Sequence, residues 1–304
     1  MEKREKYGRG EKDLRELEVE ILRSFTNLQN PVLDYFAWFL TFLGNEEFYF
    51  IILPFVFWCI SKGFGIRLLY VFIISVYINS FIKVLTAVTR PINVEGVNSL
   101  FIDSAEVGSH YPHDSFPSGH AQGSATLWGF IAYKVNRRNV WLALGLLVLL
   151  ISLARLYTGV HWPLDIIVGI AIAVIVITVY HFVEKGLSGL GDIWKITLAV
   201  IVPVIMILLF PHSEGYSYGG FLLGAGLGYF LEKKYVSMKI PFSWGRKITA
   251  YIIGAAGLFA LQAGLKLVLP EADIFSAVRY AVMGLWGIWL APYLFVKTGL
   301  YKRS

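Results

Sequence analysis

Residues 67–89 read RLLYVFIISVYINSFIKVLTAVT, and this stretch decides the fold class. No charged side chain occurs between Arg67 and Lys83. A helix of about 20 apolar residues is long enough to cross the hydrocarbon core of a bilayer. The stretch therefore predicts a transmembrane helix, with one lysine near its C-terminal end.

The composition of the whole chain agrees with this reading. Of the 304 residues, 56% are hydrophobic and 16% are charged, whereas a soluble domain carries about 25% charged residues. Cys59 is the single cysteine, which excludes an intrachain disulfide scaffold. A net charge of +6 would raise nucleic acid as a partner of a soluble protein. Here we attribute the charge to loops on one side of a membrane, so no nucleic-acid partner is expected.

Nine further apolar stretches are candidates for membrane spans. They are 31–44, 47–61, 119–135, 139–157, 163–183, 195–211, 219–232, 246–269 and 275–297. The first two and 219–232 are short for a crossing of about 20 residues. We therefore predict an all-α polytopic membrane protein with about ten transmembrane helices, or with eight or nine if the short stretches do not all cross.

The distribution of charge predicts the orientation of these helices. Lysine and arginine gather in segment 1–30 and in alternate loops, whereas the long polar loop 91–118 contains neither. Because cytoplasmic loops are rich in these residues, both termini are expected in the cytoplasm and loop 91–118 on the extracytoplasmic or lumenal side. Segment 1–30 has apolar residues at helical spacing between charges, which predicts an amphipathic helix on the inner membrane surface.

Two cations precede the outer loop. Lys83 and Arg90 are seven residues apart, which puts them on one face of a helix, about 10 Å apart along its axis. Pro91 then ends the helix. A cation within a span costs a few kcal/mol, so it usually has a partner or a function. Two stacked cations at the outer surface predict an anion site.

A second cluster follows the outer loop. Ser118 is a suitable N-cap for the span 119–135, and Gly119 allows an anion to approach the free N–H groups of the first turn. His120 adds a group that exchanges a proton near neutral pH. These residues suit a phosphate oxygen.

A third cluster lies between the spans 139–157 and 163–183. Arg155 ends the first span and His161 precedes the second. Asp165, four residues after His161, can reach back to the imidazole and fix its tautomer. A histidine at a helix end is more often structural than catalytic. All three clusters open to the same side in the predicted topology, however, and together they favour a catalytic site.

These residues resemble a known family. Lys83-x6-Arg90-Pro91, Pro117-Ser118-Gly119-His120 and Arg155-x5-His161-x3-Asp165 are similar, in order and spacing, to the three motifs of the type 2 phosphatidic acid phosphatase (lipid phosphate phosphatase) superfamily. The resemblance covers about residues 31–184. Ala154 stands where the family usually has serine, which removes a hydroxyl that could contact the phosphate. A shorter stretch, Leu43-Gly44-Asn45-Glu46-Glu47-Phe48-Tyr49, resembles the sphingosine-1-phosphate phosphatase branch.

The resemblance implies a six-helix phosphatase core at 31–184, followed by accessory transmembrane helices at 185–304. It also implies hydrolysis of an amphiphilic phosphomonoester through a phosphohistidine, without a metal or cofactor. His161 would attack phosphorus, Asp165 would orient His161, and His120 would protonate the leaving alcohol. The residues that would hold the phosphate oxygens are Lys83, Arg90, Ser118, Gly119 and Arg155.

Other functions remain open at this point. Asp103, Glu106, His110, His113 and Asp114 of the outer loop lack the spacing of metal ligands, so no metal site is predicted. An undecaprenyl (polyprenyl) diphosphate phosphatase would use the same three motifs and is the first alternative. A membrane transporter or flippase is the second, although no charged pathway is visible in residues 185–304. The expected partners are a lipid phosphate substrate and membrane lipids, and the sequence does not determine the oligomeric state.

Overall fold

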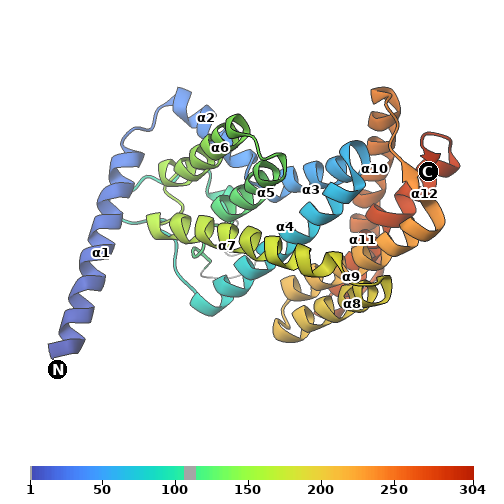
Figure 1. Cartoon of the computed structure of the whole chain (residues 1–304). Helices are drawn as coiled ribbons and strands as arrows, with labels where there is room; N and C mark the ends of the chain where they lie inside the picture. The colour runs from blue at the N-terminus through green and yellow to red at the C-terminus, as the bar shows by residue number, and fades with distance from the viewer. Residues whose placement is uncertain (1, 106–113) are drawn as a thin grey trace. The chain divides into compact units, whose positions relative to one another are not determined.

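The computed structural model of the chain describes residues 2–105 and 114–304, with side chains described from Lys12 onward except those of Ser104 and Ala105. The described residues are mostly helical (Figure 1). Glu106, His110 and His113 of the outer loop lie outside the described residues.

The α-helices follow the apolar stretches of the sequence. They are α1 (Glu2–Thr26), α2 (Pro31–Phe42), α3 (Glu46–Phe55), α4 (Lys62–Thr86), α5 (Gly119–Val135), α6 (Arg138–Tyr157), α7 (Pro163–Ser188), α8 (Asp192–Leu209), α9 (Ser213–Leu231), α10 (Trp244–Val268), α11 (Asp273–Leu285) and α12 (Ala291–Lys297). The π-helical turns are η1 (Val56–Ile60), η3 (Glu232–Val236) and η4 (Trp286–Leu290), and η2 (Ile102–Ala105) is a 3-10 turn. Strand β1 (Met238–Lys239) pairs antiparallel with β2 (Lys302–Arg303).

Among the described residues, six helices are long and apolar enough to cross a membrane. They are Lys62–Thr86, Arg138–Tyr157, Pro163–Ser188, Asp192–Leu209, Trp244–Val268 and Asp273–Lys297. Pro31–Phe42 and Glu46–Ile60 pass the same test only as a pair, which is bent by 51°. The general prediction of a helical multi-pass membrane protein is confirmed, but the count of about ten helices is not. The predicted spans 31–44 and 47–61 form one broken element.

The chain forms two compact units. The first consists of the residues up to Phe48 together with Ile78–Thr178, and the second of Tyr49–Tyr77 together with Val179–Ser304. All eight predicted site residues belong to the first unit. Residues 49–77 group with the C-terminal helices. For example, Trp58 Nε1 donates to the carbonyl oxygen of Gly287 at 2.7 Å.

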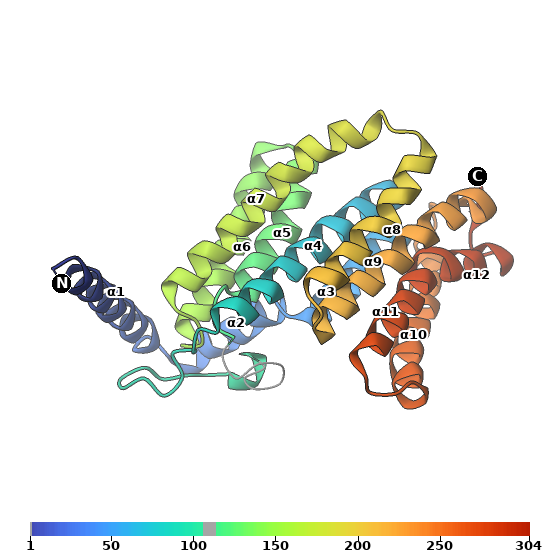
Figure 2. The same ribbon diagram turned by 90° about the horizontal axis from the view of Figure 1, so that it is seen from below.

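In the first unit, the antiparallel helices bring several helix ends together. Figure 2 shows α5, α6 and α7 lying side by side. The short turn between α5 and α6 is possible because Asn136 adopts the left-handed conformation, with φ of 49°. The start of α5, the end of α6 and the start of α7 therefore share one end of the unit. These are the positions of the second and third motifs.

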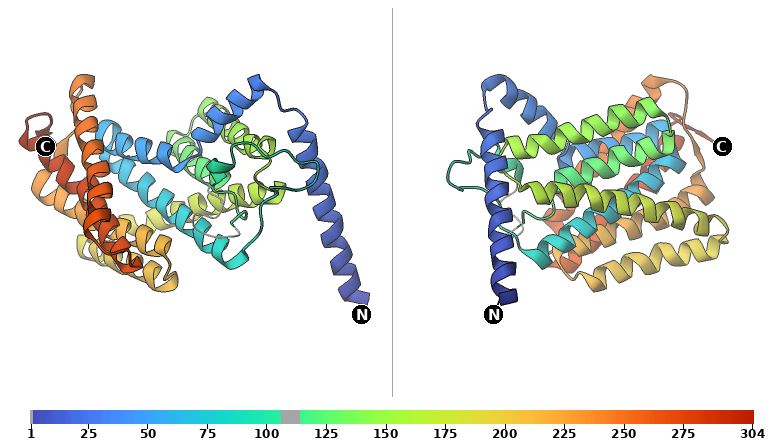
Figure 3. Two further views of the ribbon diagram at one scale, coloured as in Figure 1. Left: turned by 180° about the vertical axis from the view of Figure 1, so that it is seen from behind. Right: turned by 60° about the vertical axis from the view of Figure 1, so that its left-hand side comes forward.

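Helix α1 packs at this same end of the first unit, across the ends of α6 and α7 (Figure 3). Leu22 is fully buried in a cluster with Leu156, Trp162 and Ile166. Glu18 Oε1 accepts a hydrogen bond from the backbone N–H of Leu164 at 3.1 Å.

The placement of α1 corrects the predicted topology. The sequence placed segment 1–30 on the cytoplasmic side and the site on the opposite side, and this combination is wrong. Besides the contacts with α6 and α7, Arg23 Nη2 donates to the carbonyl oxygen of Glu95 in the outer loop at 2.7 Å. The buried face of α1 and its hydrogen bonds determine where this helix lies. A count of charges along the sequence cannot predict these contacts.

Candidate active site

A tight turn carries His161. Helix α6 ends at Tyr157 and α7 begins at Pro163. Between them Gly159 has φ of +62°, and a Cβ atom there would come within 2.8 Å of the carbonyl oxygen of Asn98. Only glycine fits this conformation and this close approach. The turn holds His161 between two helix ends.

Asp165 holds one nitrogen of His161. The distance from His161 Nδ1 to Asp165 Oδ2 is 3.2 Å, and both side chains are buried. The same carboxylate oxygen accepts hydrogen bonds from Ser115 Oγ at 2.5 Å and from the backbone N–H of Trp162 at 2.9 Å. With three groups directed at one oxygen, the carboxylate has a defined position from which it orients the imidazole.

Arg90 faces the other nitrogen of His161. Arg90 Nη1 lies 2.8 Å from His161 Nε2. Because a guanidinium only donates, Nε2 is the acceptor and the ring proton lies on Nδ1, toward Asp165. Burial, and then the positive charges of Arg90, Arg155 and Lys83, lower the pKa of His161. The imidazole is therefore neutral at pH 7, with a lone pair on Nε2.

Asp114 lies between the two cations of the first motif. Its carboxylate accepts from Arg90 Nε at 2.8 Å and from Nη2 at 2.9 Å, and Lys83 Nζ is 3.8 Å from Oδ2. In the sequence, Asp114 is a loop residue without metal-ligand spacing. The signal that could have identified it is its position just before Ser115 and the second motif.

The start of α5 faces Lys83. Ser118 is the N-cap, and its side chain accepts from the backbone N–H of Ala121. The backbone N–H of Ser118 donates to the carbonyl oxygen of Asp165 at 3.0 Å, which joins the starts of α5 and α7. A Cβ atom on Gly119 would lie 4.0 Å from Lys83 Nζ. The first turn of α5 thus borders the same cationic site.

His120 contacts the break between α2 and α3. Its Nε2 lies 2.8 Å from Asn45 Oδ1, and a Cβ atom on Gly44 would come within 2.8 Å of its Cδ2. In the sequence, Asn45 stands out only as part of the stretch that resembles a branch of the family. The structure brings it to the site, because the bent α2–α3 pair turns at this point.

Arg155 is buried beside α2. Its Nη1 donates to Thr41 Oγ1 at 3.2 Å. The preceding residue, Ala154, packs in an apolar cluster with Ala37 and Leu40 of α2. A serine hydroxyl at position 154 would therefore contact α2. In this chain the hydroxyl that contacts Arg155 is that of Thr41, which accepts its hydrogen bond.

The structure brings all eight predicted residues to one end of the first unit. The charges of Arg155, Arg90 and Lys83 all act on His120, which indicates that the second imidazole belongs to the same site. Within residues 2–105 and 114–304, no group of three or more His, Cys, Asp or Glu side chains is arranged to hold a metal ion. Cations and helix N–H groups instead form a site for an anion.

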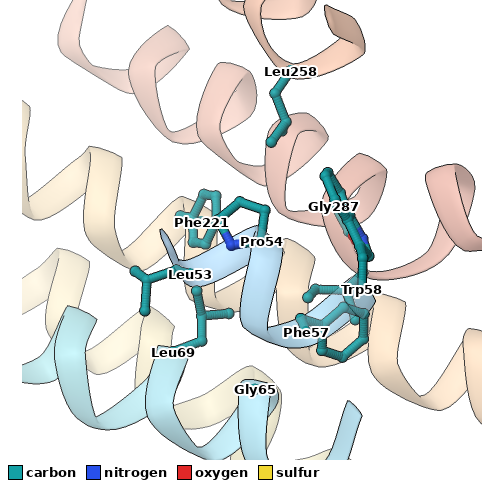
Figure 4. Close-up of a pocket in the computed structure, with 10 residues that line it drawn as sticks. Leu53, Pro54, Phe57, Trp58, Gly65, Leu69, Phe221, Leu258 and Gly287 are labelled. Atoms are coloured by element: carbon teal, nitrogen blue, oxygen red, sulfur yellow. The ribbon is translucent and has the colours of Figure 1, made fainter. Parts of the chain in front are cut away.

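A pocket in the second unit has a different character. It lies among α3, α4, α9 and α10 and is lined mainly by apolar side chains, including Leu53, Phe57, Leu69 and Leu258 (Figure 4). The indole N–H of Trp58, at its wall, is already bonded to Gly287. With no titratable side chain in its lining, this pocket offers no acid, base or nucleophile.

Comparison with known families agrees with the geometry. Residues 64–187 match the PAP2 superfamily, and residues 216–303 match the transmembrane extension of PAP2 superfamily phosphatases. The chain contains a PAP2 superfamily domain followed by the transmembrane extension of that superfamily. The family predicted from the three motifs is thereby confirmed, and much of the C-terminal segment belongs to an extension found in the superfamily.

Several individual proteins are similar to parts of the chain. Sphingosine-1-phosphate phosphatase 1 of Rattus norvegicus is 26% identical over 187 residues, which are 60% of this chain and 42% of the relative. Undecaprenyl-diphosphatase of Sulfolobus acidocaldarius is 33% identical over 115 residues, which are 36% of this chain and 50% of the relative. The crystal structure of Aquifex aeolicus LpxE is 28% identical, covers 54% of this chain and 94% of that one, and has a TM-score of 0.47. The chain spans about half the length of the curated relatives it matches.

Proposed function

We propose that this PAP2 superfamily member is an integral membrane phosphatase that hydrolyses an amphiphilic phosphomonoester without a metal ion. The observation that carries the proposal is the position of His161. Its Nδ1 faces Asp165 at 3.2 Å and its Nε2 faces Arg90 at 2.8 Å, in a site that also contains Lys83 and Arg155. A nucleophile with a defined lone pair thus lies among cations that attract a phosphate.

The reaction has two steps. In the first, His161 Nε2 attacks phosphorus and the P–O bond to the lipid alcohol breaks. His120 enters this step as the imidazolium, transfers its proton to the leaving oxygen and becomes neutral. Asp165 stabilises the positive charge that develops on the imidazole. In the second, His120 accepts a proton from water, the water oxygen attacks the phosphohistidine, and the P–N bond breaks. Inorganic phosphate leaves and both histidines return to their first states.

The phosphate oxygens interact with fixed positive groups throughout. Lys83, Arg90 and Arg155, with the first-turn N–H groups at Ser118 and Gly119, neutralise the negative charge that spreads over the equatorial oxygens. Phosphoryl transfer depends mainly on positioning and on this neutralisation. Preorganised cations and backbone dipoles perform the task that a metal ion performs in other phosphatases.

The surroundings of the site support a lipid substrate. Large apolar side chains are exposed on the helices that border it, such as Val32 and Phe36 on α2 and Leu164 and Ile167 on α7. A substrate whose phosphate enters the site can therefore leave its hydrocarbon chain in the bilayer. The similarity to sphingosine-1-phosphate phosphatases favours a long-chain phosphomonoester.

The site is proposed to open on the extracytoplasmic or lumenal side, because loop 91–118 contains no lysine or arginine. Helix α1 then lies on that side as well. The last residues of the chain, which include Lys297, Lys302 and Arg303, are proposed to be cytoplasmic.

A second candidate is hydrolysis of a polyprenyl diphosphate. The observation in its favour is the 33% identity to an undecaprenyl-diphosphatase over 115 residues. The same nucleophile, acid and cations would act on the terminal phosphate.

Purified full-length protein, reconstituted in nanodiscs, tests these proposals. Release of inorganic phosphate is measured from sphingosine-1-phosphate, phosphatidic acid and undecaprenyl diphosphate, in the presence of EDTA, with His161→Ala as the control. We expect turnover that resists EDTA, is inhibited by vanadate, and falls by about 10³-fold or more in the variant. Equal phosphate release by both proteins would overturn the role of His161, and release by neither would overturn the enzymatic proposal and favour a transporter. Loss of activity in EDTA that Mg²⁺ restores would overturn the metal-free mechanism.

A further inference from the structure

Arg90 uses all of its hydrogen-bond donors within the protein. A guanidinium side chain has five N–H groups and no acceptor. Nε donates to Asp114 Oδ1, and Nη2 donates to Asp114 Oδ2 and, at 3.4 Å, to the backbone oxygen of the same residue. Nη1 donates to the carbonyl oxygen of Val160 at 3.1 Å and faces His161 Nε2. A phosphate can therefore bind Arg90 only if one of these bonds is given up.

The carboxylate of Asp114 is the partner that a phosphate can replace. It binds the Nε and Nη2 side of Arg90 through two parallel hydrogen bonds, the geometry in which guanidinium groups also bind phosphate. It also lies 3.8 Å from Lys83 Nζ, so it contacts both cations of the first motif. Val160, by contrast, offers a neutral backbone oxygen, and the His161 nitrogen is the proposed nucleophile. Asp114 therefore occupies the position that a negatively charged ligand would take.

We infer that Asp114 is an internal anion that fills the phosphate subsite and admits only ligands more negative than itself. The inference rests on the proposed function, which it deepens by naming a feature of the substrate. A phosphomonoester near pH 7 carries a charge close to −2, so it binds Lys83 and Arg90 more strongly than the carboxylate does. A phosphodiester carries only one negative charge and gains nothing by the exchange.

This selection matters at the edge of a bilayer. The headgroups of ordinary phospholipids are phosphodiesters and surround the site at high local concentration. A cationic site without an internal anion would attract them electrostatically. With Asp114 in place, the site is closed to the diester headgroups and open to a monoester or to the terminal phosphate of a diphosphate. Asp114 thus determines specificity without taking part in bond breaking.

The test compares Asp114→Asn with wild type, and Asp103→Asn serves as the matched control. Asp103 is exposed in the same loop, so its variant makes the same chemical change away from the cations. Turnover is measured in mixed micelles that contain increasing phosphatidylglycerol or, in parallel, a neutral galactolipid. We expect phosphatidylglycerol to inhibit Asp114→Asn at a concentration about tenfold lower than it inhibits wild type or the control. The galactolipid should affect all three proteins equally.

A binding measurement separates this inference from the proposed function. Inorganic phosphate is titrated calorimetrically into the same proteins, and we expect it to bind Asp114→Asn about tenfold more tightly. If Asp114→Asn binds phosphate more tightly than wild type and neither protein shows turnover, the proposed function is rejected and the role of Asp114 is retained. Weaker binding in the variant, with no new sensitivity to phosphatidylglycerol, would show that Asp114 only positions Arg90 and would overturn the inference. If Asp114→Asn does not fold, Asp114→Ser gives the same comparison, because it also removes the charge.

Discussion

The two units of the chain differ in the charged residues they bury: the first buries a cluster of them, whereas the second buries Glu232, paired with Lys62. In the first unit, Arg90, Asp114, Arg155, His161 and Asp165 are all buried. Burying charged groups costs free energy, and proteins retain such groups mainly where they have a partner or a function.

In the second unit, helices approach closely through small residues. A Cβ atom on Gly220 would overlap the carbonyl oxygen of Ala277, and one on Gly224 would overlap that of Ala281. Glycine and alanine let the backbones of α9 and α11 pack directly against each other, which is a common way for helices to associate in membranes. The first unit is thus organised around a buried polar site and the second around packing. Substitutions should alter catalysis in one and stability in the other.

Among the variants that test this difference between the two units, His120→Ala is expected to have the largest effect, and that effect is on catalysis. Loss of a general acid lowers kcat by about 10²–10⁴-fold, and the unfolding temperature should change little. The loss of kcat/KM, which reports the step that forms the phosphohistidine, should be greatest for a lipid substrate, whose alcohol needs a proton to leave. It should be much smaller for an aryl phosphate with an acidic leaving group. Steady-state kinetics on both substrates measure this difference. An equal loss on both would contradict the assignment of His120 as the acid.

In the second unit, Gly224→Ala is expected to lower stability. The added methyl group overlaps the backbone of Ala281, and overpacking of this kind typically costs about 1–3 kcal/mol. Gly264→Ala is the matched control, because a Cβ atom there meets nothing within 4 Å. Thermal unfolding in detergent should show a lower transition temperature for the first variant only. Similar transition temperatures for the two variants would mean that the α9–α11 contact does not limit stability.

The smallest effect is expected for Glu18→Gln on α1. The Glu18 carboxylate accepts from the first turn of α7, and Arg15, which pairs with Glu18 at 3.2 Å, lies over the ring of Trp162 at 4.0 Å. A negative charge at a helix N-terminus contributes about 0.3–1 kcal/mol. Because the first turn of α7 also carries Asp165, losing this interaction should lower kcat by a few-fold with little change in KM. Glu16→Gln, exposed on the same helix, is the control. A fall in kcat with both variants would indicate a general effect of charge on α1.

The sequence alone determined the helical membrane class, the family and the residue types of the site. Runs of apolar residues long enough for a bilayer determine membrane helices almost regardless of context. The motifs around Arg90, His120 and His161 are short and local, so their spacing is visible without coordinates. The close approach of His161 and Asp165 followed directly from their separation of four residues.

Only the tertiary structure decided which groups face one another across these elements. It brought Asp114 against Arg90 and Asn45 against His120, bent 31–60 into one broken element, and packed α1 on the side of the site. Each of these depends on how helices are rotated about their axes and on the path of a loop. The rotation of the helices and the path of the loop are set by the burial of side chains that are distant in sequence. Composition and charge counts describe only what each segment contains, so they could not predict these contacts.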